Sequence, residues 1–209
     1  MSELKDLIKS VESAVMESLR LLGFEKKRGV RIKMLNDETF GWVGLNRGDY
    51  PAEKEISINP VMGVYNLRVR KLYEELMERE PSKYLIPVTS SPLGYLMPEN
   101  NYREWFFQHG IEIRPNLKDM IDSIKQYGLP WMEKQTDWKV LVEVAKTNGL
   151  QGFREYIPPT IWLAYGEKEK AIEYGEEALS KKKMKGDAKK YVDQYAKFLD
   201  KIKQWNTSD

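Results

Sequence analysis

The sequence contains no cysteine and a single histidine, His109, among its 209 residues. The lack of cysteine excludes disulfide bonds, thiol nucleophiles, iron–sulfur clusters and cysteine-bound zinc. One histidine cannot form a histidine-rich metal site, and we interpret His109 as an ordinary loop residue. The phosphate-binding patterns GxGxxG and GxxxxGKS/T and the hydrolase patterns GxSxG and HExxH are also missing. The sequence therefore reveals no catalytic residue, no metal site and no cofactor site.

Long apolar runs and an excess of one charge are absent as well. The 34 basic and 32 acidic residues give a net charge of +2, which argues against a protein that coats nucleic acid with a broadly basic surface. No stretch approaches the roughly 18 apolar residues of a membrane span. Acidic residues interrupt the apolar positions near the N-terminus, unlike in a secretory signal. Hydrophobic residues nevertheless make up 41% of the chain, enough for a folded core. We therefore expect a cytoplasmic protein without a membrane partner.

The periodicity of the apolar residues predicts a helix followed by a β-hairpin at the start of the chain. Apolar side chains recur at intervals of three and four over residues 4–22, as on one face of a helix, and Gly23 can end that helix. The period then changes to two over 30–34 and 40–45. This change predicts two paired strands joined by a polar turn at 36–39.

Further strands are expected where short alternating or aromatic runs lie between loop signals. Residues 55–59 alternate and stop at Pro60, after a predicted loop at 46–52. Residues 84–88 contain a proline, which predicts an edge strand, and the aromatic run at 105–107 predicts another strand.

Helical patterns alternate with these strands and dominate the second half of the chain. They include 64–77 and 115–127, where Gly128 is expected to stop the second helix. The sequence thus predicts an α+β fold, with an antiparallel sheet of four or five strands, packed helices and an all-helical C-terminal region. We expect residues 1–112 to form the sheet domain and residues 113–209 to form a helical region packed against it, or both to form one continuous domain.

Several motifs together resemble a known family. A long amphipathic helix is followed by LGFEKK at 22–27, a hairpin that carries Trp42, a third strand that ends at Asn59, and YGLPW at 127–131. This pattern resembles a family of uncharacterised bacterial proteins known only as a domain of unknown function, and it covers most of the chain. The resemblance implies no catalytic residues.

A second, local resemblance lies near the C-terminus. Residues 163–166 (LAYG), followed by Ala171, Ile172 and 177–179 (EAL), resemble a tetratricopeptide helix pair. Arrays of that family repeat every 34 residues or so and need about three copies for stability, whereas the sequence has one. The resemblance implies a single helical hairpin rather than an extended peptide-binding groove.

The strongest local charge lies in residues 181–190, which hold six lysines and one acidic residue. An anion such as a nucleic-acid backbone or an acidic protein face could bind there. No arginine or aromatic residue interrupts the segment, although the binding of single strands usually involves stacking rings. A solvated turn between helices explains the same pattern, because lysines are favoured near helix C-termini. The candidate anion-binding residues are Lys181, Lys182, Lys183, Lys185, Lys189 and Lys190.

Four aromatic residues in predicted loops are the candidate partner-binding residues. Exposed rings are typical of the energetically important positions in protein interfaces, although rings can also anchor loops by burial. These rings and the missing catalytic motifs favour a non-enzymatic protein that binds another protein or itself; an immunity-like or defence-accessory role follows by analogy only. The alternatives are a nucleic-acid-associated protein that uses the lysine segment and a hydrolase whose site is assembled from scattered residues. The four aromatic residues are Tyr50, Tyr95, Tyr102 and Trp131.

Overall fold

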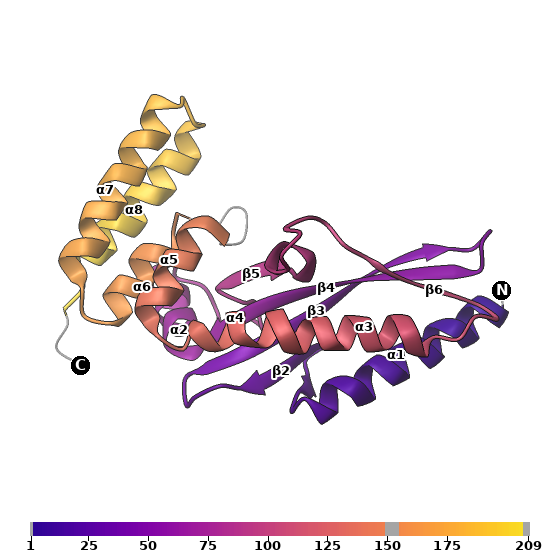
Figure 1. The fold of residues 1–209 in the computed structure, drawn as a ribbon. Coiled ribbons are helices and arrows are strands. Elements are labelled where there is room, and N and C mark those ends of the chain that lie inside the picture. The colour runs from indigo at the N-terminus through magenta and orange to yellow at the C-terminus, as the bar shows by residue number, and fades with distance from the viewer. Residues whose placement is uncertain (1, 149–154, 207–209) are drawn as a thin grey trace. The chain divides into compact units, whose positions relative to one another are not determined.

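The computed structural model describes residues 2–148 and 155–206 (Figure 1). The chain divides into two compact units. The first unit contains Met1–Val64 and Ser90–Lys134, and the second contains Tyr65–Thr89 and Gln135–Asp209. Each unit is thus assembled from two separate stretches of chain, with other boundaries than the expected division after residue 112.

The first unit is built on an antiparallel β-sheet, and the predicted α+β class is confirmed. Within the described residues the sheet has six strands in the order β1-β2-β3-β4-β5, and β6 also pairs with β4. A short 3-10 helix, η1 (Leu93–Leu96), follows β5. The strands are β1 (Glu25–Lys27), β2 (Val30–Met34), β3 (Thr39–Tyr50), β4 (Glu55–Asn66), β5 (Thr89–Pro92) and β6 (Trp105–Gln108).

The first helix and the hairpin form as the sequence predicts. Helix α1 covers Ser2–Leu21, and Gly23 then takes a φ of 85°, a conformation that glycine adopts without steric cost. β2 and β3 are antiparallel neighbours. The side-chain oxygen of Asn36 accepts a hydrogen bond from the backbone N–H of Thr39 at 2.7 Å and fixes the turn between the two strands.

Strand pairing extends beyond the limits that the sequence predicts. The expected loop at 46–52 is wrong over 46–50, because β3 continues as a paired strand to Tyr50. The turn before β4 is confined to 51–54. The expected stop at Pro60 is also wrong, because β4 continues to Asn66. The first residues of the helix expected at 64–77 therefore belong to β4 instead.

The strand expected at 84–88 is not formed in the described residues, and β5 lies just after that segment. The aromatic strand is confirmed as β6, which pairs antiparallel with β4. Pro87 removes a backbone donor that a strand at 84–88 would use.

Helices cover one face of this sheet. After β6 the chain forms α3 (Arg114–Ser123), a π-helical turn η2 (Ile124–Gly128) and α4 (Leu129–Lys134). The expected stop at Gly128 is wrong: the helix continues, and a Cβ at this position would lie 2.7 Å from the Met62 side chain. α1 contacts α3 and β6, and α4 contacts β3 (Figure 1). The core of the unit includes Val11, Val15, Leu19, Val43, Ile56, Ile58 and Phe107.

The second unit is helical apart from the ends of two strands. α5 contacts α6, α6 contacts α7, α7 contacts α8, and α2 contacts both α6 and α8. Gly166, with a φ of 83°, separates α6 from α7, and these two helices contact each other. None of the helices in the described part of the chain combines the length and apolar character required to cross a lipid bilayer. The helices are α2 (Leu67–Leu76), α5 (Trp138–Asn148), α6 (Ile157–Ala164), α7 (Lys168–Met184) and α8 (Lys189–Gln204).

Candidate functional site

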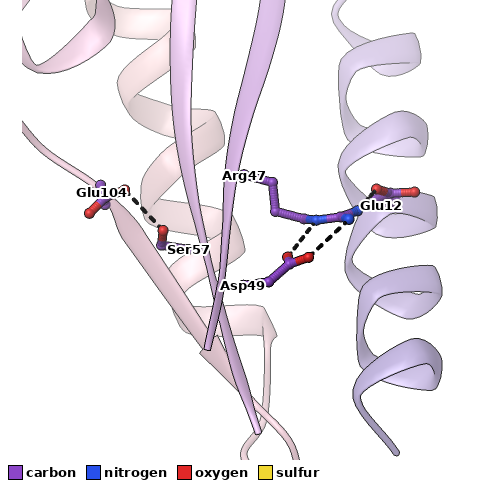
Figure 2. A network of polar contacts seen from close by, with 5 residues as sticks. All are labelled: Glu12, Arg47, Asp49, Ser57 and Glu104. Atoms are coloured by element: carbon purple, nitrogen blue, oxygen red, sulfur yellow. Dashed lines mark hydrogen bonds and ion pairs between the residues drawn. The ribbon is translucent and has the colours of Figure 1, made fainter. Parts of the chain in front are cut away.

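Side-chain alternation along β3 separates the two faces of the sheet. The Arg47 guanidinium donates hydrogen bonds to Asp49, at 2.7 Å, and to Glu12 of α1 (Figure 2). The pKa of Arg47 is raised, chiefly by its hydrogen bond to Asp49. Because successive residues of a strand point to opposite faces, Gly48 and Tyr50 lie on the face away from α1.

A second polar contact marks that opposite face. The Ser57 hydroxyl of β4 donates to Glu104 at 2.9 Å, on the other side of the β3 and β4 ribbons from α1 (Figure 2). Ser57 is the register partner of Phe106 in β6, so both residues share this face. A Cβ at Gly48 would lie 2.7 Å from the Ser57 hydroxyl and 3.2 Å from the Tyr50 hydroxyl. Tyr50 and Phe106 are therefore displayed on the same side of the sheet.

Four exposed aromatic side chains lie around these contacts. The ring centroids of Tyr50 and Phe106 are 6.1 Å apart. The pKa of Tyr102 is raised, first by its hydrogen bond to Glu104, with smaller contributions from desolvation and from the nearby Tyr50 and Tyr95 hydroxyls. The exposed fractions are 38% for Tyr50, 46% for Tyr95, 57% for Tyr102 and 42% for Phe106. We call these four residues the aromatic surface.

Close contacts hold η1, which carries Tyr95, against the loop that carries Tyr102. A Cβ at Gly94 would lie 2.3 Å from the backbone oxygen of Asn101, so these chains approach closely only because residue 94 is glycine. The side-chain amide of Asn59 donates to the Arg103 carbonyl at 2.6 Å. This bond fixes the loop that carries Tyr102 to β4.

The structure brings together three of the four predicted partner-binding residues: Tyr50, Tyr95 and Tyr102. Trp131 is half-buried on α4, which packs on the opposite, covered face, where Met132 contacts Gly41. Sequence reasoning misses Phe106, which lies in an aromatic run between two buried rings. The signal that could identify Phe106 is the alternation of side chains along a strand, which places it on the opposite face from its neighbours. The structure shows this alternation, because the residues of β6 are in turn buried, exposed, buried and exposed.

The lysine segment covers the end of α7 and the start of α8, and much of its charge is compensated. Lys190 lies 4.8 Å from the ring centre of Tyr191. Lys183 and Lys185 form no ion pair with any described residue. The remaining three lysines pair with carboxylates: Lys181 with Glu177, Lys182 with both Glu155 and Asp187, and Lys189 with Asp193.

Two ionisable side chains, His109 and Glu74, each have an ordinary structural environment. His109 is exposed, and its backbone N–H donates to the Lys54 carbonyl at 2.9 Å. Glu74 is largely buried and pairs with Arg70 at 3.1 Å. Across the described ranges, no group of three or more histidine, aspartate or glutamate side chains is placed to hold a metal ion.

Comparisons of the chain with known protein families, with curated proteins and with solved structures returned no match. The resemblance to an uncharacterised bacterial family therefore stays a prediction.

Proposed function

We propose that this protein is a non-enzymatic, cytoplasmic binding protein whose aromatic surface contacts another protein. The observation that carries the proposal is the gathering of Tyr50, Tyr95, Tyr102 and Phe106. Tyr50 comes from β3 and the other three rings come from residues 95–106, and all four remain partly exposed.

The chemistry of this surface fits a protein partner. Tyrosine and phenylalanine rings provide large apolar contact areas at a low cost in side-chain entropy, and tyrosines add a hydroxyl that can form hydrogen bonds. Such rings often dominate the binding energy of a protein interface. The carboxylate of Glu104 lies among them, hydrogen-bonded to Tyr102. A negative charge at this position repels a phosphate backbone, so the surface fits a protein better than a nucleic acid.

The nucleic-acid alternative rests on the lysine segment, and the compensated charges there do not favour it. A phosphate backbone would have to compete with the carboxylates that pair with Lys181, Lys182 and Lys189. Titration of a fluorescent single-stranded oligonucleotide at low salt is the direct check. We expect no saturable binding.

The double variant Tyr95→Ala/Tyr102→Ala tests the role of the aromatic surface. Immobilised wild-type and variant proteins are used as baits in a lysate of the source cells, and the captured proteins are quantified. Sedimentation velocity in parallel reports self-association. We expect the variant to lose a captured protein, or a dimer, by about tenfold or more, as is usual when interface rings are truncated.

The matched control is Tyr84→Ala/Tyr191→Ala, which removes two exposed tyrosines (72% and 51%) that are not part of the aromatic surface. The control should retain the partner at the wild-type level. The proposal fails if both double variants lose the same proteins, or if neither variant differs from the wild type.

A further inference from the structure

A cleft in the first unit lies between α1 and the strands β1, β2 and β3. It has a volume of about 580 Å³, within the range typical of sites for small molecules. It opens on the helix-covered side of the sheet, where Arg47 and Glu12 lie, and not on the side of the aromatic surface. The cleft and the aromatic surface are therefore separate features of the first unit.

The lining of the cleft combines apolar surface with positive charge. Ile8 and Met16 of α1 and Leu45 of β3 are half-buried apolar residues along it. Five cationic side chains and one acidic side chain, Glu12, also line it. The cationic residues are Lys5, Lys9, Lys26, Arg31 and Arg47.

Most of this positive charge is not compensated within the protein. Arg47 is held by Asp49 and Glu12. Lys5, Lys9 and Lys26 form no ion pair with any residue that the structure describes. These three lysines therefore remain available to an anion that enters the cleft.

Arg31 is the distinctive member of the set. Its Nε is buried and has no hydrogen-bond partner among the described residues, and one of its terminal nitrogens donates only to the adjacent Val30 carbonyl at 3.3 Å. Burial lowers the pKa of the guanidinium, and the charge of Glu12 opposes this effect only in part. Buried polar groups in proteins are normally hydrogen-bonded. An arginine with an unused donor beside a cleft is therefore the arrangement expected of an anion-binding group.

We propose that this cleft binds a small amphipathic anion, in which a phosphate or carboxylate contacts Arg31 and the lysines while an apolar chain covers Ile8, Met16 and Leu45. A free inorganic anion would satisfy the cations and leave the apolar lining in water. A neutral apolar molecule would bury that lining and leave Arg31 without an acceptor. Only a ligand with both parts uses the whole cleft.

Three probes separate these contributions: n-octyl phosphate, n-octanol and inorganic phosphate. Isothermal titration calorimetry at low ionic strength, below the concentration at which octyl phosphate aggregates, measures each one against the full-length protein. We expect saturable binding of one octyl phosphate per chain, and binding of the other two probes that is at least about tenfold weaker. The affinity for octyl phosphate should fall as salt is added, since charge attraction contributes to it.

The variant Arg31→Met removes the charge and keeps much of the side-chain volume, and it should weaken octyl phosphate binding by about tenfold or more. Lys33→Met, two residues along the same strand and outside the cleft, is the matched control and should stay within about twofold of the wild type. If Arg31→Met does not fold, as judged by circular dichroism, Lys9→Met on the exposed surface of α1 replaces it, with a loss of about threefold or more expected.

Three outcomes would overturn the proposal. The first is equal binding of octanol and octyl phosphate, which would show an apolar cleft without anion recognition. The second is the absence of saturable binding of octyl phosphate. The third is an equal loss of affinity in the cleft variant and in Lys33→Met.

Discussion

Single residues beneath the aromatic surface decide how its rings are placed. Gly48 leaves room for the Tyr50 side chain, which a Cβ would approach to 3.2 Å. Glu104 accepts hydrogen bonds from the Ser57 hydroxyl and from Tyr102, so one carboxylate links the buried floor of the surface to an exposed ring. Rings held in this way lose less side-chain entropy on binding than mobile rings would.

Gly94 offers a test at the residue scale. In Gly94→Ala the new Cβ would meet the backbone oxygen of Asn101 at 2.3 Å, and a backbone atom cannot rotate away. We expect the free energy of unfolding to fall by about 3 kcal/mol, at the upper end of the usual cost of overpacking. Urea denaturation followed by tryptophan fluorescence measures this loss.

Gly29→Ala is the matched control, because Gly29 has a positive φ of 84° and no neighbour within 4 Å of an added Cβ. This substitution should lower the free energy of unfolding by only about 1 kcal/mol, the strain of an alanine in the left-handed conformation. An equal loss of stability at the two positions would show that the close approach at Gly94 does not constrain the loops.

At the scale of elements, hydrophobic periodicity predicts the parts of the fold in which local and tertiary preferences agree. α1 and the β2–β3 hairpin are correct because a strong apolar period is bounded by suitable turn residues. Predictions fail where pairing overrides local signals. Residues 46–50 contain asparagine, glycine and aspartate, which favour loops, yet they extend β3. Pro60 lies two residues beyond the last pair of β4 with β6, at Ile58, and β4 nevertheless continues past it to Asn66.

The candidate site also has features that the sequence predicts and features that it does not. The sequence predicts that Tyr50, Tyr95 and Tyr102 lie in loops, where rings are often exposed. The structure exposes all three, although Tyr50 ends β3 and Tyr95 lies in η1. No sequence pattern shows that the three lie together, because their proximity depends on the pairing of β6 with β4 and on the loop contact at Gly94. Trp131 fails as a member because the predicted helix end at Gly128 does not occur, and the residue remains on a packed helix.

The junction of α7 and α8 provides a prediction at the element scale. The Lys182 side chain is only 12% exposed and pairs with Glu155 and Asp187. Removing one member of such a buried group leaves its partners uncompensated. We expect Lys182→Met to lower the free energy of unfolding by about 2 kcal/mol, less than for a fully buried pair because the two carboxylates are partly exposed. The adjacent Lys183→Met should change it by less than about 0.5 kcal/mol.

The pH dependence of this junction follows from the same contacts. Burial opposes the charge of Lys182, but its hydrogen bonds and attraction to Glu155 and Asp187 raise its pKa above the ordinary value of 10.5. A raised pKa means that the contribution to stability is fully present below the unfolded value and is lost as pH rises through the folded value. The stability difference between wild type and Lys182→Met, measured in urea, should therefore be constant near neutral pH and shrink only above about pH 10.5. Equal stability of the Lys182→Met and Lys183→Met variants would contradict this account of the lysine segment.

At the scale of the whole molecule, the first unit carries two different surfaces on the two sides of one sheet. The helix-covered side contains the basic cleft, and the other side displays the aromatic surface. The second unit, by contrast, buries several rings in its core, among them Tyr73, Tyr195 and Phe198. Exposed rings that gather on one surface indicate a binding site more strongly than isolated rings do, because single exposed hydrophobic residues are common on any protein.

The most direct measurement is site-specific photo-cross-linking in living source cells. A benzophenone amino acid replaces Tyr95 in one protein and the exposed Tyr84 in another, and irradiation links each protein to whatever lies against that side chain. We expect a discrete heavier species, formed with another protein or a second copy, when the probe is at position 95 and not when it is at position 84. Identical patterns at the two positions, or no adduct at position 95, would contradict the claim that the aromatic surface is where this protein binds.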